Sequence, residues 1–144
     1  MLFRSANQCA DAVFDHSKEG YLDEIKDATG GKGVDVIIEM LANVNLQMDF
    51  EVLAMFGRIC VVGNRGSLDF NPRAIMGKDA TVTGMALYNA PQAAFDEIHG
   101  AICEGLSNGY LNPIISKTFP LSDAPAAHRE VIESKSAGKV VLIP

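Results

Sequence analysis

Two short runs of apolar, mostly β-branched residues dominate the hydrophobic pattern of this chain. They are Val34–Met40 and Arg58–Gly63, and the amphipathic stretch Leu46–Phe56 lies between them. A strand, a helix and a second strand in this order form the crossover unit of a parallel sheet. Val34–Met40 carries apolar residues on both faces, so we expect a buried strand that is covered on both sides.

The segments before this unit continue the alternation of strands and helices. Asp11–His16 is expected to form a short strand, and Tyr21–Ala28 carries its apolar residues at helical spacing. The glycines of Gly30–Gly33 then stop the helix and turn the chain. Asn43 or Asn45 is suited to cap the central helix, which we expect to run to Phe56.

The alternation continues after the second strand and then loosens. The further elements expected are a helical turn opened by Asn71-Pro72, a strand at Thr81–Leu87, a helix from Pro91 to Asn108, an extended segment at Ile114–Phe119, a helix from its N-cap Ser122 to about Ser134, and a strand at Lys139–Ile143. This order predicts an α/β fold built on a doubly wound parallel sheet. We expect residues 1–112 to form one domain, and residues 113–144 to belong to a different sheet or a neighbouring domain.

The composition is ordinary for a globular domain, with 48% hydrophobic and 21% charged residues among 144. A net charge of −6 argues against a nucleic-acid surface built on a basic patch. Cys9, Cys60 and Cys103 are odd in number and widely spaced, which indicates a reducing compartment. The apolar runs are too short to span a bilayer, and Met1–Ser5 does not begin a signal peptide. We therefore expect a cytoplasmic protein.

Four segments bring chemically useful groups to the ends of predicted strands. They are His16, Met40–Asn45, Gly63–Arg65 and Met85–Leu87. The carboxyl ends of parallel strands share one edge of a sheet, and doubly wound sheets hold their cofactors at this edge. The four segments therefore predict a dinucleotide site.

Each residue suits a particular part of such a ligand. His16 is suited to hydrogen-bond an adenine or a ribose, and Asn45 to donate to a phosphate or a ribose. Gly63 lets a ligand approach the backbone closely, and Arg65 is able to pair with a phosphate through two hydrogen bonds. The backbone of Met85–Leu87 is placed to read the carboxamide of a nicotinamide.

The same residues also have purely structural explanations. His16 is compatible with a surface loop, Asn45 with a helix cap and Arg65 with a solvated side chain. Gly63 and Gly66 are both compatible with residues that only serve the turn.

Other motifs are weaker or missing. His99 and Cys103 have the spacing of two metal ligands on one helix, but no second pair accompanies them, so we expect no metal site. The phosphate-binding pattern G-x-G-x-x-G is absent from the sequence. A flavodoxin-like or receiver domain is a further α/β alternative, although the chain lacks its acidic cluster at a strand end.

Four stretches carry a specific resemblance to a known family. They are Tyr21–Ile25 (YLDEI), Gly33–Asn45 (GVDVIIEMLANVN), Arg58–Gly66 (RICVVGNRG) and Asn71–Arg73 (NPR). In these stretches the chain resembles the NADPH:quinone oxidoreductases of the zeta-crystallin family, within the medium-chain dehydrogenase/reductase superfamily. The resemblance runs over nearly the whole chain, and it covers only the carboxyl-terminal part of such an enzyme.

The resemblance implies that particular positions of this chain bind NADPH. The implied contacts are His16, Asn45, Val62, Gly63, Asn64, Arg65, Met85, Ala86 and Leu87. Asn64 stands where the family has a serine. No catalytic residue is implied within this stretch, and the family lacks the zinc of its alcohol-dehydrogenase cousins.

The resemblance also implies which parts are missing. The expected fold is an incomplete Rossmann fold that lacks the first two strands and the glycine-rich loop, with residues 113–144 returning toward a missing catalytic domain. Because the missing strands would lie between Asp11–His16 and Val34–Met40, we expect these two segments either to pair directly or to stay loosely associated.

The activity implied by the resemblance is hydride transfer from NADPH to a quinone, and we expect the isolated chain to be inactive. The alternative is a non-catalytic truncated module that makes an oligomer contact through Thr81–Leu87. The resemblance further implies a homo-oligomer and, for some family members, binding of AU-rich RNA. We expect no membrane partner.

Overall fold

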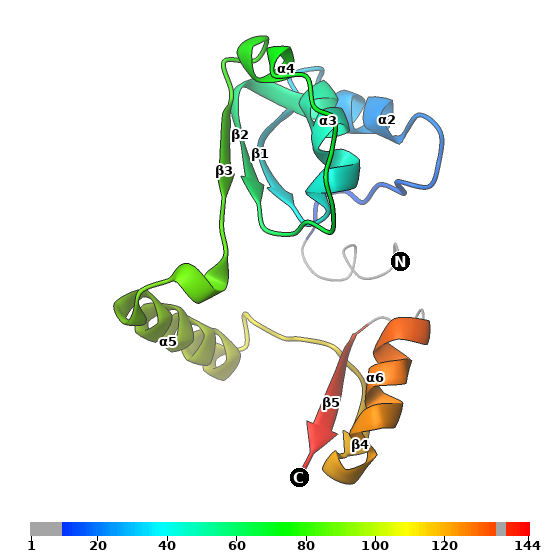
Figure 1. Cartoon of the computed structure of the whole chain (residues 1–144), viewed down its shortest axis with the longest axis vertical. Coiled ribbons are helices and arrows are strands. Elements are labelled where there is room, and N and C mark those ends of the chain that lie inside the picture. The colour runs from blue at the N-terminus through cyan, green and yellow to red at the C-terminus, as the bar shows by residue number, and fades with distance from the viewer. Residues whose placement is uncertain (1–9, 135–137) are drawn as a thin grey trace. The chain divides into compact units, whose positions relative to one another are not determined.

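The computed structural model describes residues 10–134 and 138–144 of the chain. They fall into two compact units, one of residues 10–89 and one that contains residues 90–144. The first unit holds a three-stranded sheet and the second a two-stranded sheet, and both sheets are parallel (Figure 1). The α/β prediction is therefore confirmed, whereas the predicted domain boundary after residue 112 stays a prediction.

The first unit alternates helices and strands as predicted. Its elements are α2 (Tyr21–Ala28), β1 (Val34–Glu39), α3 (Ala42–Val52), β2 (Leu53–Val61), α4 (Arg73–Met76), β3 (Thr81–Gly84) and the 3-10 turn η1 (Leu87–Asn89). The strand order is β1-β2-β3. Ile37 lies opposite Ile59, and Ile59 lies opposite Val82, so the apolar side chains are in register across the sheet.

The central helix is shorter than predicted. It ends at Val52, and β2 begins at Leu53, so the prediction of a helix up to Phe56 is wrong. Leu53 is fully buried and lies opposite Val34, and Phe56 takes a left-handed conformation with φ of 61°. The apolar run is compatible with a helix or a strand. The strand forms because it pairs with β1 and buries Leu53.

The strand predicted for Asp11–His16 does not form. Residues 12–15 have no regular secondary structure, and β1 is an edge of its sheet. Among the described residues, the backbone of this stretch makes one hydrogen bond, in which the Lys18 amide donates to the Asp15 carbonyl at 3.0 Å. A strand needs a partner for its backbone groups, and no described residue supplies one here.

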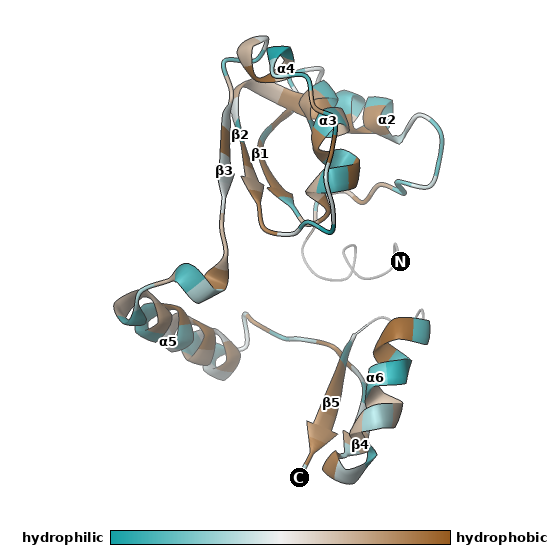
Figure 2. Ribbon diagram, viewed as in Figure 1, coloured by the Kyte–Doolittle hydropathy of each residue, from teal (hydrophilic) through white to brown (hydrophobic). Residues whose placement is uncertain are grey.

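One face of the three-stranded sheet covers the core. Phe50, Leu53 and Ile59 are its buried centre, and side chains of α4 and of the loop before it, including Phe70, pack against them. The rings of Phe50 and Phe70 are 5.6 Å apart. Helices α3 and α4 therefore cover this face of the sheet. Figure 2 shows that β1 and β2 are largely hydrophobic.

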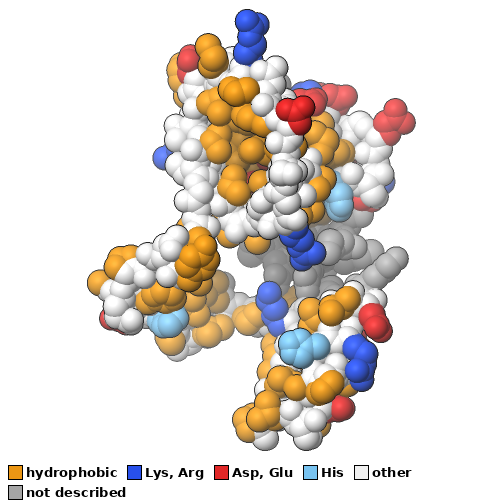
Figure 3. Space-filling model, in the orientation of Figure 1, with side chains coloured by type: hydrophobic (Ala, Val, Ile, Leu, Met, Phe, Trp, Pro, Cys, Tyr) orange, Lys and Arg blue, Asp and Glu red, His pale blue; other side chains and the backbone are white. Residues whose placement is uncertain are grey.

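The opposite face of the sheet is open. Val36 and Ile38 of β1 are 50% and 61% exposed. The prediction that this strand is buried on both faces is therefore wrong, because within residues 10–89 only the face of Ile37 and Glu39 is covered. Hydrophobic side chains are visible on the surface of both units in Figure 3.

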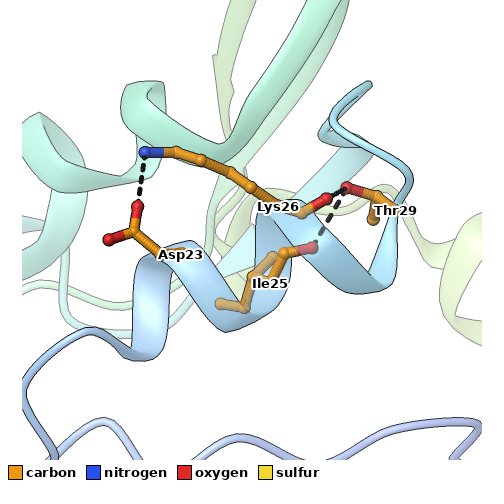
Figure 4. A network of polar contacts seen from close by, with 4 residues as sticks. All are labelled: Asp23, Ile25, Lys26 and Thr29. Carbon is orange, nitrogen blue, oxygen red and sulfur yellow. Dashed lines mark hydrogen bonds and ion pairs between the residues drawn. The ribbon is translucent and has the colours of Figure 1, made fainter.

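Thr29 joins the end of α2 to the turn that leads into β1. Its hydroxyl group lies 3.0 Å from the Ile25 carbonyl and 2.9 Å from the Lys26 carbonyl (Figure 4). The Gly33 amide donates to the same hydroxyl group at 3.1 Å. The glycine turn predicted after α2 is present, with left-handed glycines at residues 30, 31 and 33.

The second unit is built from amphipathic elements. They are α5 (Gln92–Asn108), β4 (Ile115–Pro120), the 3-10 turn η2 (Leu121–Asp123), α6 (Ala124–Glu133) and β5 (Lys139–Ile143). β4 pairs in parallel with β5, and Lys117 of β4 forms an ion pair of 3.0 Å with Glu130 of α6. The predicted N-cap Ser122 lies within η2, and Asp123 holds the N-cap position instead.

Cys60 and Cys103 are free thiols, while Cys9 and Met1–Ser5 lie outside the described residues. Among the helices that the structure describes, none combines the length and the apolar character that a membrane crossing needs.

Candidate functional site

The carboxyl ends of the three strands meet at one edge of the sheet. The amides of Val62 and Gly63 both donate to the carbonyl oxygen of Glu39, at 2.8 and 3.1 Å. The Met85 amide donates to the Val61 carbonyl at 2.9 Å. Backbone hydrogen bonds thus hold the segments after β1, β2 and β3 side by side, as the parallel arrangement of the strands requires.

Gly63 makes the closest approach at this edge. A Cβ atom at this position would overlap the carbonyl oxygen of Met40. The Ala42 amide donates to the Gly63 carbonyl at 3.0 Å, so the start of α3 is tied to the turn after β2. Only glycine leaves room for this approach, which gives Gly63 a structural reason independent of any ligand.

Two amide side chains of α3 anchor the loop after β2. Asn43 Oδ1 accepts from the Arg65 amide at 2.9 Å, and Gln47 Oε1 accepts from the Asn71 amide at 3.3 Å. Within the loop, Asn64 Nδ2 donates to the Gly66 carbonyl at 2.6 Å. The side chain of Arg65 is exposed and makes no hydrogen bond or ion pair with a described residue.

The predicted role of Asn43 or Asn45 as helix cap is wrong. Leu41 occupies the N-cap position of α3, and no side chain caps the helix. Asn43 turns instead to the Arg65 amide, and Asn45 Nδ2 donates to Glu39 Oε1 at 3.2 Å. Sequence reasoning missed these roles because both partners lie outside the helix.

Glu39 is the buried acid at the end of β1. It is 4% exposed, and its Oε1 atom accepts from the Leu41 amide and from Asn45 Nδ2. These two hydrogen bonds fix the chain between β1 and α3, where the sequence predicted a ligand contact. The signal for this residue was a carboxylate near the end of an apolar run, since such a group needs donors when it is buried.

Asp49 lies one turn of α3 beyond Asn45. Its Oδ2 atom is buried and has no hydrogen-bond partner among the described residues. Burial, followed by the neighbouring Glu39 carboxyl, raises the pKa of the Asp49 carboxyl to about 7. The protonated and the ionised form of Asp49 are therefore both populated near neutral pH, and the protonated form prevails below it.

Comparison with known proteins shows to which family the chain belongs. A sequence profile of the zinc-binding dehydrogenases matches residues 9–142. The chain belongs to the zinc-binding dehydrogenase family. In the described part of the chain, no group of three or more His, Cys, Asp or Glu side chains could hold a metal ion.

Several relatives of this chain are quinone oxidoreductases. Those of Sus scrofa and Rattus norvegicus are 43% and 42% identical over 135 residues, which are 93% of this chain and 41% of each relative. A solved NAD-dependent alcohol dehydrogenase has a similar fold, with a TM-score of 0.82 and 25% identity over 99% of this chain and 40% of that one. The resemblance to the carboxyl-terminal part of quinone oxidoreductases is thus confirmed, and the chain spans about two fifths of their length.

The remaining predicted site residues are less closely tied to the edge. Met85 and Leu87 follow β3 and are 47% and 52% exposed, and the Ala86 carbonyl accepts from the Asn89 amide at 2.9 Å. His16 is exposed in a turn and makes no hydrogen bond to β1, β2 or β3. The structure therefore joins the segments after three strands by hydrogen bonds and leaves His16 without a hydrogen bond to them.

His99 and Cys103, the pair with metal-ligand spacing, lie on α5. The His99 ring lies 5.9 Å from the ring of Phe95, and Cys103 is exposed. The contact of His99 is thus an aromatic one.

Proposed function

We propose that this chain supplies the cofactor-binding side of an NADPH-dependent quinone oxidoreductase. The observation that carries the proposal is the edge at which the carbonyl oxygen of Glu39 accepts from both Val62 and Gly63. This edge is where doubly wound sheets hold dinucleotides. Membership of the zinc-binding dehydrogenase family supports a nicotinamide cofactor.

The residues at this edge fit such a ligand. Gly63 has no side chain above the turn, and the exposed Arg65 guanidinium has no competing partner among the described residues. A guanidinium group binds phosphate through two parallel hydrogen bonds. In the proposed site the cofactor is held by His16, Asn45, Val62, Gly63, Asn64, Arg65, Met85, Ala86 and Leu87.

The roles of these residues are to bind and to orient. The nicotinamide supplies the hydride, and a quinone is the proposed acceptor. Arg65 neutralises phosphate charge, while the backbone after β3 positions the carboxamide of the ring. No residue of this chain is proposed to donate or remove a proton, so the chain on its own is expected to bind cofactor without turning over quinone.

Titration of the full chain with NADPH, followed by cofactor fluorescence, tests the proposal. Arg65→Gln removes one charged phosphate contact, for which we expect about tenfold weaker binding of NADPH. Arg129→Gln on the exposed side of α6 is the matched control and leaves the affinity unchanged. The absence of saturable binding up to about 1 mM cofactor would reject the proposed function.

A second candidate function rests on the open edge of the sheet. β3 is the last strand in the order β1-β2-β3, and Thr81 and Thr83 are exposed. An unpaired edge of this kind is a template for pairing with another strand. We propose that β3 is a contact between two copies of this chain.

The oligomeric state measured by light scattering tests this contact. Thr83→Lys places a charge on the edge strand, and we expect it to convert a dimer into a monomer. Ser67→Lys, in the exposed loop after β2, is the control and leaves the dimer intact. A wild-type monomer at all concentrations, or a dimer that Thr83→Lys does not affect, speaks against the contact.

A further inference from the structure

Glu39, which is buried, and Asp49, which is partly buried, form a pair of acids that the proposed contacts do not use. Glu39 is 4% exposed at the end of β1, and Asp49 lies on α3 within hydrogen-bonding range of its carboxyl group. Asp49 Oδ2 is buried, and no described residue donates a hydrogen bond to it. The two carboxyl groups therefore lie together, and no described cation forms an ion pair with either of them.

Ionised carboxylates accept hydrogen bonds and cannot donate them. If both carboxyl groups were ionised, they would repel each other and leave buried oxygens without a donor. A single proton between them removes the repulsion, because the protonated acid donates to the ionised one. The already occupied Oε1 atom of Glu39 can then keep its bonds to the Leu41 amide and to Asn45 Nδ2.

The neighbouring elements supply no alternative partner. α3 packs against β1, β2, α2 and α4. The charged side chains of these four elements are Asp35 and Glu39 on β1, Arg58 on β2, Asp23, Glu24, Lys26 and Asp27 on α2, and Arg73 on α4. Lys26 is paired with Asp23 at 3.2 Å, and Arg58 and Arg73 are exposed, so Glu39 alone acts on the Asp49 carboxyl.

We propose that Glu39 and Asp49 share one proton, and that this proton orients Glu39 so that it positions Asn45 and the Leu41 amide at the cofactor edge. Glu39 and Asp49 are thus positioning residues that act through Asn45. The consequence for binding rests on the proposed function, whereas the shared proton and its effect on Asn45 do not. When the proton is lost, the two carboxylates repel, and Asn45 loses its fixed partner.

Nuclear magnetic resonance of the full chain without cofactor provides the first test. The side-chain amide signals of Asn45, assigned by their loss in Asn45→Ala, should shift with pH and have a midpoint near pH 7. Asp49→Asn keeps a donor toward Glu39 at every pH, and we expect it to abolish the shift. Asp27→Asn, the same change at an exposed position of α2, should leave the shift as it is in the wild type.

Binding provides the second test. NADPH affinity of the wild type should fall about fivefold relative to Asp49→Asn between pH 6 and pH 8.5, as expected for the loss of one hydrogen bond. The ratio of the two proteins cancels the titration of the cofactor itself. Glu39→Gln retains an acceptor for Leu41 and Asn45 and should also give the flat profile.

The possible outcomes separate the two proposals. Asn45 signals that do not move with pH, or that move equally in Asp49→Asn, overturn the shared proton. If Asp49→Asn fails to fold, the carboxyl carbon signal of Asp49 in the wild type decides, because titration at the ordinary value near 3.8 also overturns it. A titrating Asn45 without NADPH binding leaves the shared proton standing and rejects the proposed function.

Discussion

Residues 10–89 bury a core of their own, whereas residues 90–144 expose most of their apolar side chains. In the first unit Leu53 and Ile59 are both 0% exposed, and Phe50 is 4% exposed. Among the described hydrophobic residues of the second unit, only Ala127 is fully buried. The apolar stripe of α5 is open, with Ile102 and Leu106 exposed at 43% and 49%.

The difference follows from the number of layers that each unit can close. Three strands with helices on one face enclose side chains such as Ile59, while a two-stranded sheet is marginal even when one helix covers it. Both units have amphipathic elements, but only the first unit buries several of its large apolar side chains. Local opening should therefore require more free energy in residues 10–89 than in residues 90–144.

The largest expected effect is the loss of a core side chain in the first unit. Leu53→Ala leaves a cavity beside Phe50 and Ile59, and we expect it to lower the free energy of unfolding by about 3 kcal/mol. Leu106→Ala removes the same atoms from the open face of α5 and should cost less than about 1 kcal/mol. Urea unfolding followed by circular dichroism measures both.

Equal losses for the two leucines would contradict the comparison. They would mean that Leu106 is buried in solution as deeply as Leu53, and the second unit would then have a core of its own.

The close approach at the cofactor edge gives the next largest effect. Gly63→Ala places a Cβ against the Met40 carbonyl oxygen, and we expect it to destabilise the first unit by about 2 kcal/mol. A Cβ at Gly84, at the end of β3, meets no atom within 4 Å, so Gly84→Ala is the matched control. Thermal melts should separate the two variants, and a neutral Gly63→Ala would show that the turn is looser than its hydrogen bonds indicate.

Near neutral pH, the first unit alone should lose stability as the pH rises, because of Asp49. The raised pKa of Asp49 means that the folded state holds a proton that the unfolded state has released. The stability from this proton is complete below the ordinary value of 3.8 and is lost as the pH rises to about 7. With a discount for partial solvation, the loss should be about 1–2 kcal/mol.

In the second unit Lys117 and Ser134 lower the pKa of Glu130, so its contribution is present above pH 4.5 and is lost at more acid pH. Asp15 in the first unit also has a lowered pKa and acts in the same acid range. Melting temperatures between pH 5 and pH 8 therefore isolate Asp49. The wild type should become less stable with rising pH relative to Asp49→Asn, and parallel curves would contradict the assignment.

Much of the fold could be predicted because its signals are local. Apolar β-branched runs and helical spacing marked β1, α3 and most of β2. Helix α5 ends at Asn108 as predicted, and Gly109, with φ of 78°, follows it. Two predictions were wrong where the partner decides the structure. Leu53–Phe56 is part of β2 because β1 pairs with Leu53. Asp11–His16 has no regular structure because no described strand pairs with it.

The candidate site was predictable as an edge but not in its supporting contacts. The order of strands placed Gly63 next to the end of β1 and Met85 next to the end of β2. Nothing local indicated that Asn43 would hold the amide of Arg65, 22 residues away, or that Glu39 and Asp49 would meet. Such contacts depend on the tertiary fold, so single-sequence patterns do not report them.

The smallest expected effect is a gain in the second unit. Gly100 lies inside α5, and a Cβ there meets no atom within 4 Å, so Gly100→Ala should stabilise the helix by about 0.5–1 kcal/mol. Gly109→Ala is the control, because its φ of 78° disfavours any side chain and should make the variant less stable. Hydrogen exchange of the α5 amides measures both changes.

Since α5 is largely exposed, the gain should appear in the exchange of residues 92–108 and leave the exchange of β1 and β2 unchanged. Slower exchange throughout residues 10–89 would instead show that the two units unfold as one.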